Sequence, residues 1–160
     1  MSTRQNFAQL LAGGAVLRGW ARSAFGDATE GVSWIEGGIA DYRATGGRRG
    51  LPFFLALKAE ALYLGNRIFE ALEATTEAEE LAERFEERFW RADLYRLRGV
   101  FLTALGNDEA RIEASFQAAI TTAREQKSIS LEKRAEATYA EYRRQKASGL
   151  GGRGFRLPLS

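Results

Sequence analysis

The sequence repeats one pattern three times at a fixed spacing. Each copy places a small residue inside an apolar run, with a Gly or Asn stop seven residues later and an acidic residue soon after. The small residues are Gly19, Ala59 and Gly99, so successive copies are 40 residues apart. A fixed period of roughly 20–50 residues is typical of repeat proteins, whose units bury their apolar faces by stacking on one another. The period therefore predicts a stack of similar units.

Between the stops, apolar residues recur every three or four positions, which indicates amphipathic helices. This spacing predicts seven helices, at residues 6–25, 28–44, 52–64, 67–84, 89–105, 109–125 and 130–145. Gly13 and Gly14 predict a kink in the first helix, or a helix that begins only at residue 15. Glycines 19, 31 and 38 are instead predicted to be points where a neighbouring helix comes very close.

The predicted fold is all-α, with three helix pairs followed by a capping helix. We expect one helical repeat domain over residues 1–146 and a glycine-rich tail over 147–160. In the tail, three apolar residues alternate with other types, at Phe155, Leu157 and Leu159, which suits an extended segment. Two interpretations stay open: a disordered tail, or a tethered peptide that docks in a groove of this chain or of a neighbouring copy.

The chain contains neither cysteine nor histidine, which excludes several kinds of active site. A Ser-His-Asp triad, a Cys-His pair, a disulfide and a Cys- or His-bearing zinc site all need one of these residues. Acidic side chains such as Glu79, Glu80 and Glu83 fall on the polar side of a predicted helix. A solvent-exposed face is a simpler interpretation of them than a catalytic role. We therefore predict that the protein is not an enzyme and has no catalytic site, metal site or cofactor.

No apolar run approaches the ~18 residues that a membrane-spanning helix needs. Polar residues interrupt the apolar residues near the start, which argues against a secretory signal. These features predict a cytoplasmic protein without a membrane partner. A net charge of +2, with both signs interspersed, does not by itself predict nucleic-acid binding.

Helix pairs with a small central residue, a Gly or Asn stop and then an acidic start resemble tetratricopeptide-type repeats. The 40-residue period is longer than the usual repeat of about 34, and the usual first-helix Trp is not kept. Residues 17–21, 42–46 and 92–99 more specifically resemble the C-terminal repeat segments of large bacterial signalling ATPases and class III adenylyl cyclase homologues. The resemblance covers about residues 11–145.

This resemblance implies a right-handed solenoid of helical hairpins that serves as a protein-interaction or regulatory module in signalling. It does not bring catalysis, because the chain has no Gly-x-x-x-x-Gly-Lys-Ser/Thr phosphate loop and no room for a cyclase domain. Whether the chain is free-standing or part of a larger signalling protein stays open.

In a stack of helix pairs, the first helix of each pair lines a concave groove. Positions offset from Gly19, Ala59 and Gly99 are therefore predicted to bind a protein or peptide partner. They are Trp20, Ser23, Ala56, Glu60, Tyr63, Arg96, Val100 and Thr103. We expect Tyr63 and Arg96 to be exposed in this groove, whereas Trp20 could belong to the groove or to the core.

Two alternatives accompany this hypothesis. Tyr139, Tyr142 and Arg143 on the last helix are predicted to cap the stack or to form the face of a homodimer, because an open stack leaves an apolar end. Nucleic-acid binding through the arginines of the basic linker and tail is the weaker alternative, since it depends on a single short Gly-Arg-Gly-Phe stretch.

Overall fold

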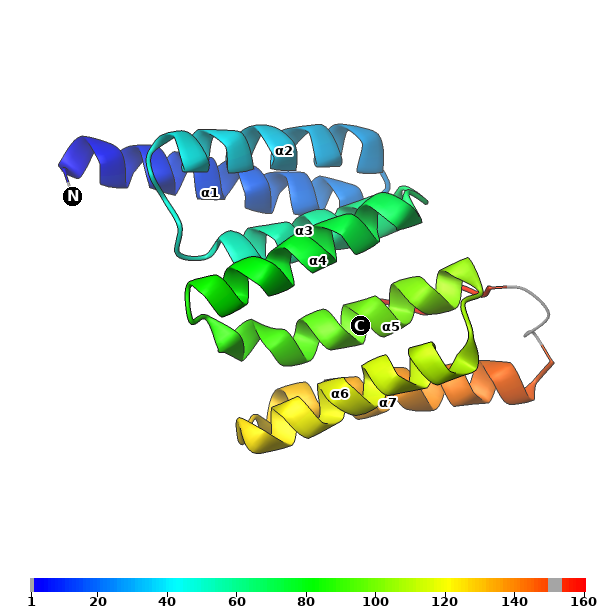
Figure 1. Ribbon diagram of the computed structural model, residues 1–160. Helices are drawn as coiled ribbons and strands as arrows, with labels where there is room; N and C mark the ends of the chain where they lie inside the picture. The colour runs from blue at the N-terminus through cyan, green and yellow to red at the C-terminus, as the bar shows by residue number, and fades with distance from the viewer. Residues whose placement is uncertain (1, 150–153) are drawn as a thin grey trace. The chain divides into compact units, whose positions relative to one another are not determined.

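The computed structural model describes residues 2–149 and 154–160, and this part of the chain is helical without a strand (Figure 1). The elements are α1 (Thr3–Ala24), α2 (Ala28–Ala44), α3 (Leu51–Leu64), α4 (Ile68–Arg84), the 3-10 helix η1 (Arg88–Trp90), α5 (Arg91–Leu105), α6 (Glu109–Glu125) and α7 (Ile129–Ala147). The predicted all-α class is confirmed, and most helix ends lie within two residues of their predicted positions.

The chain divides into two compact units, Met1–Glu87 and Arg88–Ser160. In the first unit, α1 packs along α2 and α3 packs along α4, while α3 also contacts both α1 and α2. In the second unit, α5 packs along α6, and α7 contacts both of them. Each unit therefore contains helices that are neighbours in sequence and pack as neighbours in space.

Side-chain caps explain where several helices begin. Ser2 accepts a hydrogen bond from the backbone N–H of Gln5, whose side chain returns to the Ser2 backbone N–H, so a complete capping box starts α1. The side chains of Asp108 and Ser128 cap α6 and α7 by accepting a hydrogen bond from the backbone N–H three residues later. The expected late start at residue 15 is wrong, because the capping box begins α1 early and the helix continues through Gly13 and Gly14. The alternative of a kink at these glycines stays a prediction.

The backbones of α1 and α2 approach so closely that only glycine fits at their contact points. A Cβ added to Gly19 would lie 2.6 Å from the Gly31 carbonyl oxygen, and one added to Gly31 would lie 2.5 Å from the Gly19 carbonyl oxygen. At Gly38 an added Cβ would lie 2.8 Å from the Ala12 carbonyl oxygen. The predicted role of these three glycines is confirmed.

Aromatic rings form the centre of the second unit. Gly99 on α5 lies against the ring of Phe116 on α6, where an added Cβ would be 2.6 Å from the nearest ring atom. Phe116 stacks on Tyr139 of α7, with their ring centroids 5.4 Å apart. Gly99 is therefore a second kind of close approach, in which the small residue makes room for an aromatic ring.

Candidate functional site

The predicted groove residues of the first unit serve mainly to hold its helices together. The Trp20 indole donates a hydrogen bond to the Glu60 carboxylate at 2.6 Å, which links α1 to α3. Ser23 is buried and donates to a backbone carbonyl of its own helix. The expectation that Tyr63 is exposed is wrong, because only 2% of it is accessible. Trp20 and Ala56 keep partial exposure.

The predicted groove residues of the second unit are also buried. Arg96 has 0% of its surface exposed, so the expectation that it is open to solvent is wrong. Val100 and Thr103 are equally inaccessible, and the Thr103 hydroxyl donates to the Gly99 carbonyl oxygen at 2.7 Å. For Arg96 the physical reason is specific: Leu159 of the tail contacts it.

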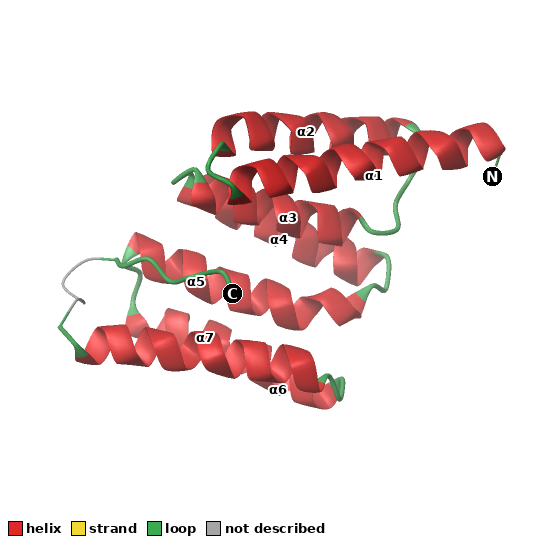
Figure 2. Cartoon of the chain, turned by 180° about the vertical axis from the view of Figure 1, so that it is seen from behind, coloured by secondary structure: helices red, strands yellow, loops and turns green. Residues whose placement is uncertain are grey.

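The tail segment, residues 154–160, lies beside α5 and contacts α5 and α7 (Figure 2). Its side chains alternate in burial: Leu157 is only 2% exposed, Phe155 and Leu159 are half-buried, and Arg156 and Pro158 are exposed. Such alternation is that of an extended chain with one face against a surface. Of the two interpretations of the tail, the docked one therefore describes these residues.

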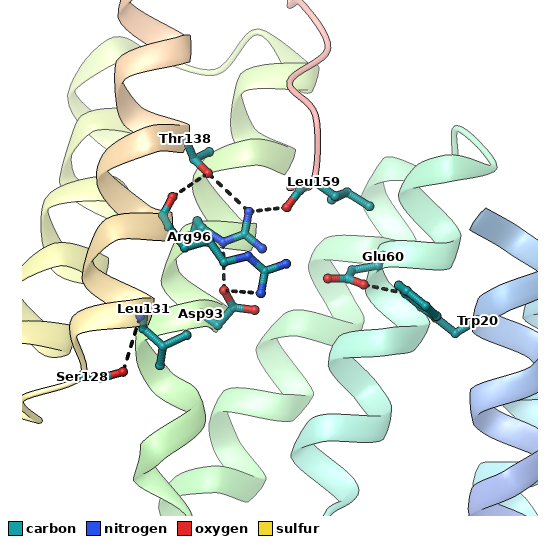
Figure 3. A network of polar contacts seen from close by, with 9 residues as sticks. Trp20, Glu60, Asp93, Arg96, Ser128, Leu131, Thr138 and Leu159 are labelled. Atoms are coloured by element: carbon teal, nitrogen blue, oxygen red, sulfur yellow. Dashed lines mark hydrogen bonds and ion pairs between the residues drawn. The ribbon is translucent and has the colours of Figure 1, made fainter. Parts of the chain in front are cut away.

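The Arg96 side chain binds the backbone of the tail segment (Figure 3). The Arg96 Nη1 donates to the Leu159 carbonyl oxygen at 2.7 Å and to the Thr138 hydroxyl at 3.4 Å. Its Nε donates to the Asp93 carboxylate at 2.8 Å, which neutralises the buried cation. A charged donor that is fixed in this way forms a stronger hydrogen bond than a neutral one.

Two further contacts fix the position of the tail segment. The Phe155 ring stacks on Tyr142 of α7, with a centroid separation of 5.8 Å and an interplanar angle of 17°. Gly154 passes so close to the end of α5 that an added Cβ would lie 2.1 Å from the Ala104 carbonyl oxygen. The tail segment runs antiparallel to α5, because Gly154 lies against Ala104 near the end of that helix and Leu159 contacts Arg96, eight residues earlier. It also runs antiparallel to α7, because Phe155 stacks on Tyr142 and the Arg96 Nη1 that binds Leu159 also reaches Thr138, four residues earlier.

We call the surface formed by Asp93, Arg96, Ala104, Thr138 and Tyr142 the α5/α7 face. It offers an extended peptide a cationic donor for a backbone carbonyl, an aromatic ring for stacking and a tight passage for glycine. Burial raises the pKa of the Tyr142 hydroxyl, so this residue stays a neutral aromatic platform at physiological pH. The Arg96 Nη2 is buried and has no hydrogen-bond partner within the described residues.

The predicted cap residues on α7 are mostly internal to the second unit. Tyr139 and Tyr142 are buried and stack on one another at 6.3 Å, so neither ring presents a free dimer face. The Arg143 guanidinium lies 3.9 Å from the centre of the Tyr139 ring, and the Arg143 residue as a whole is exposed. Their packing agrees with a capping role for α7 on its neighbours.

The basic linker forms part of the first unit. Arg43 makes an ion pair with Glu77 of α4. Arg48 lines an open hollow of about 420 Å³ together with Arg84 and Phe85. Nucleic-acid binding through this linker stays the weaker alternative. None of the helices in the described ranges is both long and apolar enough to cross a membrane.

Sequence reasoning named Arg96 and Tyr142 but did not assign them to the same site. It missed Thr138 as a site residue and did not identify Leu157 as the buried anchor. The alternation of Phe155, Leu157 and Leu159 was the available signal, since this pattern indicates an extended segment with one buried face.

Comparisons with known proteins show one relative of much greater length. The chain is 28% identical to an uncharacterized protein of Rhizobium meliloti (strain 1021) over 134 residues. These aligned residues make up 83% of this chain. The matched region makes up 13% of that protein, so the chain spans only a small part of its length. No protein-family profile matches the chain, and no solved structure matches it.

Proposed function

We propose that this protein is a non-catalytic interaction module whose α5/α7 face binds an extended peptide segment of a protein partner. One observation carries the proposal: the tail segment is seated on this face as a peptide ligand would be. Its backbone is bound through the Leu159 carbonyl oxygen, and its Leu157 side chain is buried. A surface that accommodates one extended segment by backbone and alternate side chains has the features needed to accommodate another.

The chemistry of Arg96 supports a binding role in addition to a structural one. Burying a cation without partners is strongly unfavourable, and Asp93 supplies the compensating charge. Arg96 then still has donors for other groups, and one of them reaches the tail backbone. A hydrogen bond from a charged donor contributes about 1.5–3 kcal/mol. The bound group is a main-chain carbonyl, which every peptide offers.

We place the module in a tetratricopeptide-like, right-handed solenoid of three helix pairs with α7 as its cap. The 40-residue period and the packing of α1 on α2, α3 on α4 and α5 on α6 support this arrangement. The resemblance to repeat segments of signalling ATPases and cyclase homologues suggests a regulatory role, which we place in the cytoplasm. The much longer relative is compatible with such repeats as parts of large proteins.

The test uses the full chain with its tail segment released. Replacing Leu157 by Asp puts a charge at a buried position, which costs several kcal/mol and expels the segment from the α5/α7 face. The probe is a fluorescein-labelled peptide with the sequence Gly-Phe-Arg-Leu-Pro-Leu-Ser, which corresponds to residues 154–160. We expect its fluorescence anisotropy to rise saturably when it is titrated with the L157D protein.

A second variant that releases the tail segment shows whether the result depends on the L157D substitution itself. Gly154→Val introduces a side chain where even a Cβ would lie 2.1 Å from the Ala104 carbonyl oxygen, so the same release is expected. Circular dichroism establishes that both variants keep their helices. If both are folded and neither binds the peptide, the proposed function is wrong.

Self-association is a second candidate function, and a different surface favours it. Phe7, Leu10 and Leu17 are 62%, 73% and 49% exposed, and their spacing puts them along one side of α1. Exposed apolar residues that gather in this way commonly mark an interaction surface. Light scattering over a concentration series tests this candidate: a mass that stays that of one chain, and is the same in Leu10→Glu, would contradict it.

A further inference from the structure

The α5/α7 face sets distinct requirements at successive positions of the segment that it binds. The first position must be glycine, because the Ala104 carbonyl oxygen leaves no space for a Cβ. The second position, Phe155, holds an aromatic ring against Tyr142. Two positions later, Leu157 is the buried leucine. Pro158, which follows the leucine, is exposed and carries no such requirement.

A third apolar side chain follows at Leu159, which is half-buried, and its carbonyl oxygen is the one that Arg96 binds. The requirements together specify four positions: a glycine, an aromatic residue directly after it, a leucine two residues later, and an apolar residue two residues after the leucine. Each of these four requirements comes from a contact or from the burial of a described residue. The pattern is therefore a recognition rule for peptides that bind the α5/α7 face.

We propose that the tail segment is a built-in competitor for the α5/α7 face, and that the partner carries a Gly-aromatic-x-Leu-x-apolar segment which must displace it. This inference rests on the proposed function, and it adds the sequence class of the ligand and the regulation of the site. The partner inserts its leucine where Leu157 lies and presents a carbonyl oxygen to Arg96. Binding of the partner and release of the tail segment are then one exchange.

Tethering determines how strongly the tail segment competes. A segment joined to its site by a short connection has an effective concentration on the order of 1 mM. If the free peptide binds an open face with a Kd of about 100 µM, the tail segment fills the face in roughly nine of ten molecules. The apparent affinity of any competing peptide then falls about tenfold.

The experiment compares the wild-type chain with L157D by anisotropy of the labelled Gly-Phe-Arg-Leu-Pro-Leu-Ser peptide. We expect the wild-type protein to bind about tenfold more weakly than L157D. Pro158→Asp is the matched control, because it places the same charge at the neighbouring exposed position and leaves Leu157 in place. It is expected to bind as weakly as the wild type does.

Peptide variants test the recognition rule on L157D. Replacing the peptide glycine by valine, or its first leucine by aspartate, is expected to weaken binding tenfold or more. Replacing its proline by alanine is expected to change binding less than twofold, since the corresponding Pro158 is exposed. Equal loss at all three positions would overturn the rule.

The outcomes separate this inference from the proposed function. Saturable binding to L157D with the same affinity for the wild type would leave peptide binding intact and overturn the competitor role. Absence of binding to every folded variant would instead overturn the proposed function. If the wild-type protein has the mass of two chains and L157D that of one, the segment comes from a second copy, which overturns competition within one chain.

Discussion

Trp20 and Glu60 occupy equivalent positions in two successive repeats, 40 residues apart, and the Trp20 Nε1 donates directly to the Glu60 carboxylate at 2.6 Å. Glu60 is 7% exposed, so this carboxylate lies in a poorly hydrated place. Trp20→Phe keeps an aromatic ring and removes the donor. We expect the free energy of unfolding of the first unit to fall by about 2–3 kcal/mol, because a buried charged acceptor loses a partner.

Urea titration followed by circular dichroism measures this change. Trp34→Phe is a matched control, because Trp34 is 38% exposed and lies 4.9 Å beneath the Arg22 guanidinium. Its expected cost is below about 0.5–1 kcal/mol, the range for a whole exposed cation–π contact, because phenylalanine keeps an aromatic face beneath the guanidinium. Equal costs for the two substitutions would mean that the Trp20–Glu60 hydrogen bond does not stabilise the unit.

Two glycines of α2 should respond in opposite directions to alanine. Gly31→Ala places a Cβ 2.5 Å from the Gly19 carbonyl oxygen and is expected to cost roughly 1–3 kcal/mol through overpacking. At Gly37 an added Cβ meets nothing within 4 Å, so Gly37→Ala is expected to stabilise α2 by about 0.5–1 kcal/mol. Thermal unfolding of the two variants gives the comparison, and the same sign for both would contradict it.

Phe155 should control how often the tail segment leaves the α5/α7 face. Phe155→Ala removes the ring that stacks on Tyr142, a contact worth about 0.5–1.5 kcal/mol beyond its buried area. Trypsin cleavage after Arg156, followed by mass spectrometry, reports the released population. We expect cleavage to become roughly five- to tenfold faster.

Phe89→Ala provides the control for cleavage, because Phe89 also lies in the second unit, is 55% exposed and has its own aromatic contact with Trp90. It should leave the cleavage rate after Arg156 unchanged. Acceleration by both variants would show that the second unit opens as a whole rather than at the tail segment.

Glu141 should contribute to stability only above a certain pH. Hydrogen bonds from Arg144 and then Gln145 lower the pKa of the Glu141 carboxyl from 4.5 to about 2. Because the folded pKa lies below the unfolded value, the contribution is complete above about pH 4.5 and is lost as the pH falls towards 2. Glu141→Gln should therefore melt below the wild type at about pH 6, with the difference vanishing near pH 2. A difference independent of pH would contradict this assignment.

The helix positions could be predicted from the sequence because their signals are local. Gly and Asn stops, the caps Asp108 and Ser128, and the three- and four-residue spacing each act within a few residues of chain. The close-approach glycines were also predictable, since a glycine inside a helix is unfavourable unless another backbone needs the space. The predictions for Gly19, Gly31 and Gly38 are confirmed.

The exposure of individual side chains could not be predicted in the same way. Helix α3 is in contact with α1, α2 and α4, and its buried residues include the consecutive run from Ala59 to Tyr63. A helix that is covered on several sides has no single solvent-exposed face. Positions at a fixed sequence distance from Ala59 therefore need not face a groove. Arg96 was misjudged for another reason: what covers it lies 63 residues away in the sequence.

The close contact between α1 and α2 also bears on how this helix pair forms and opens. Consecutive helices joined by a short turn form contacts of low sequence separation, which generally form fast. Because their backbones touch at Gly19 and Gly31, no water layer separates the two helices there. Amide protons on the inner sides of α1 and α2 should then exchange with solvent only when the hairpin opens as one cooperative segment, and not by fraying of single turns.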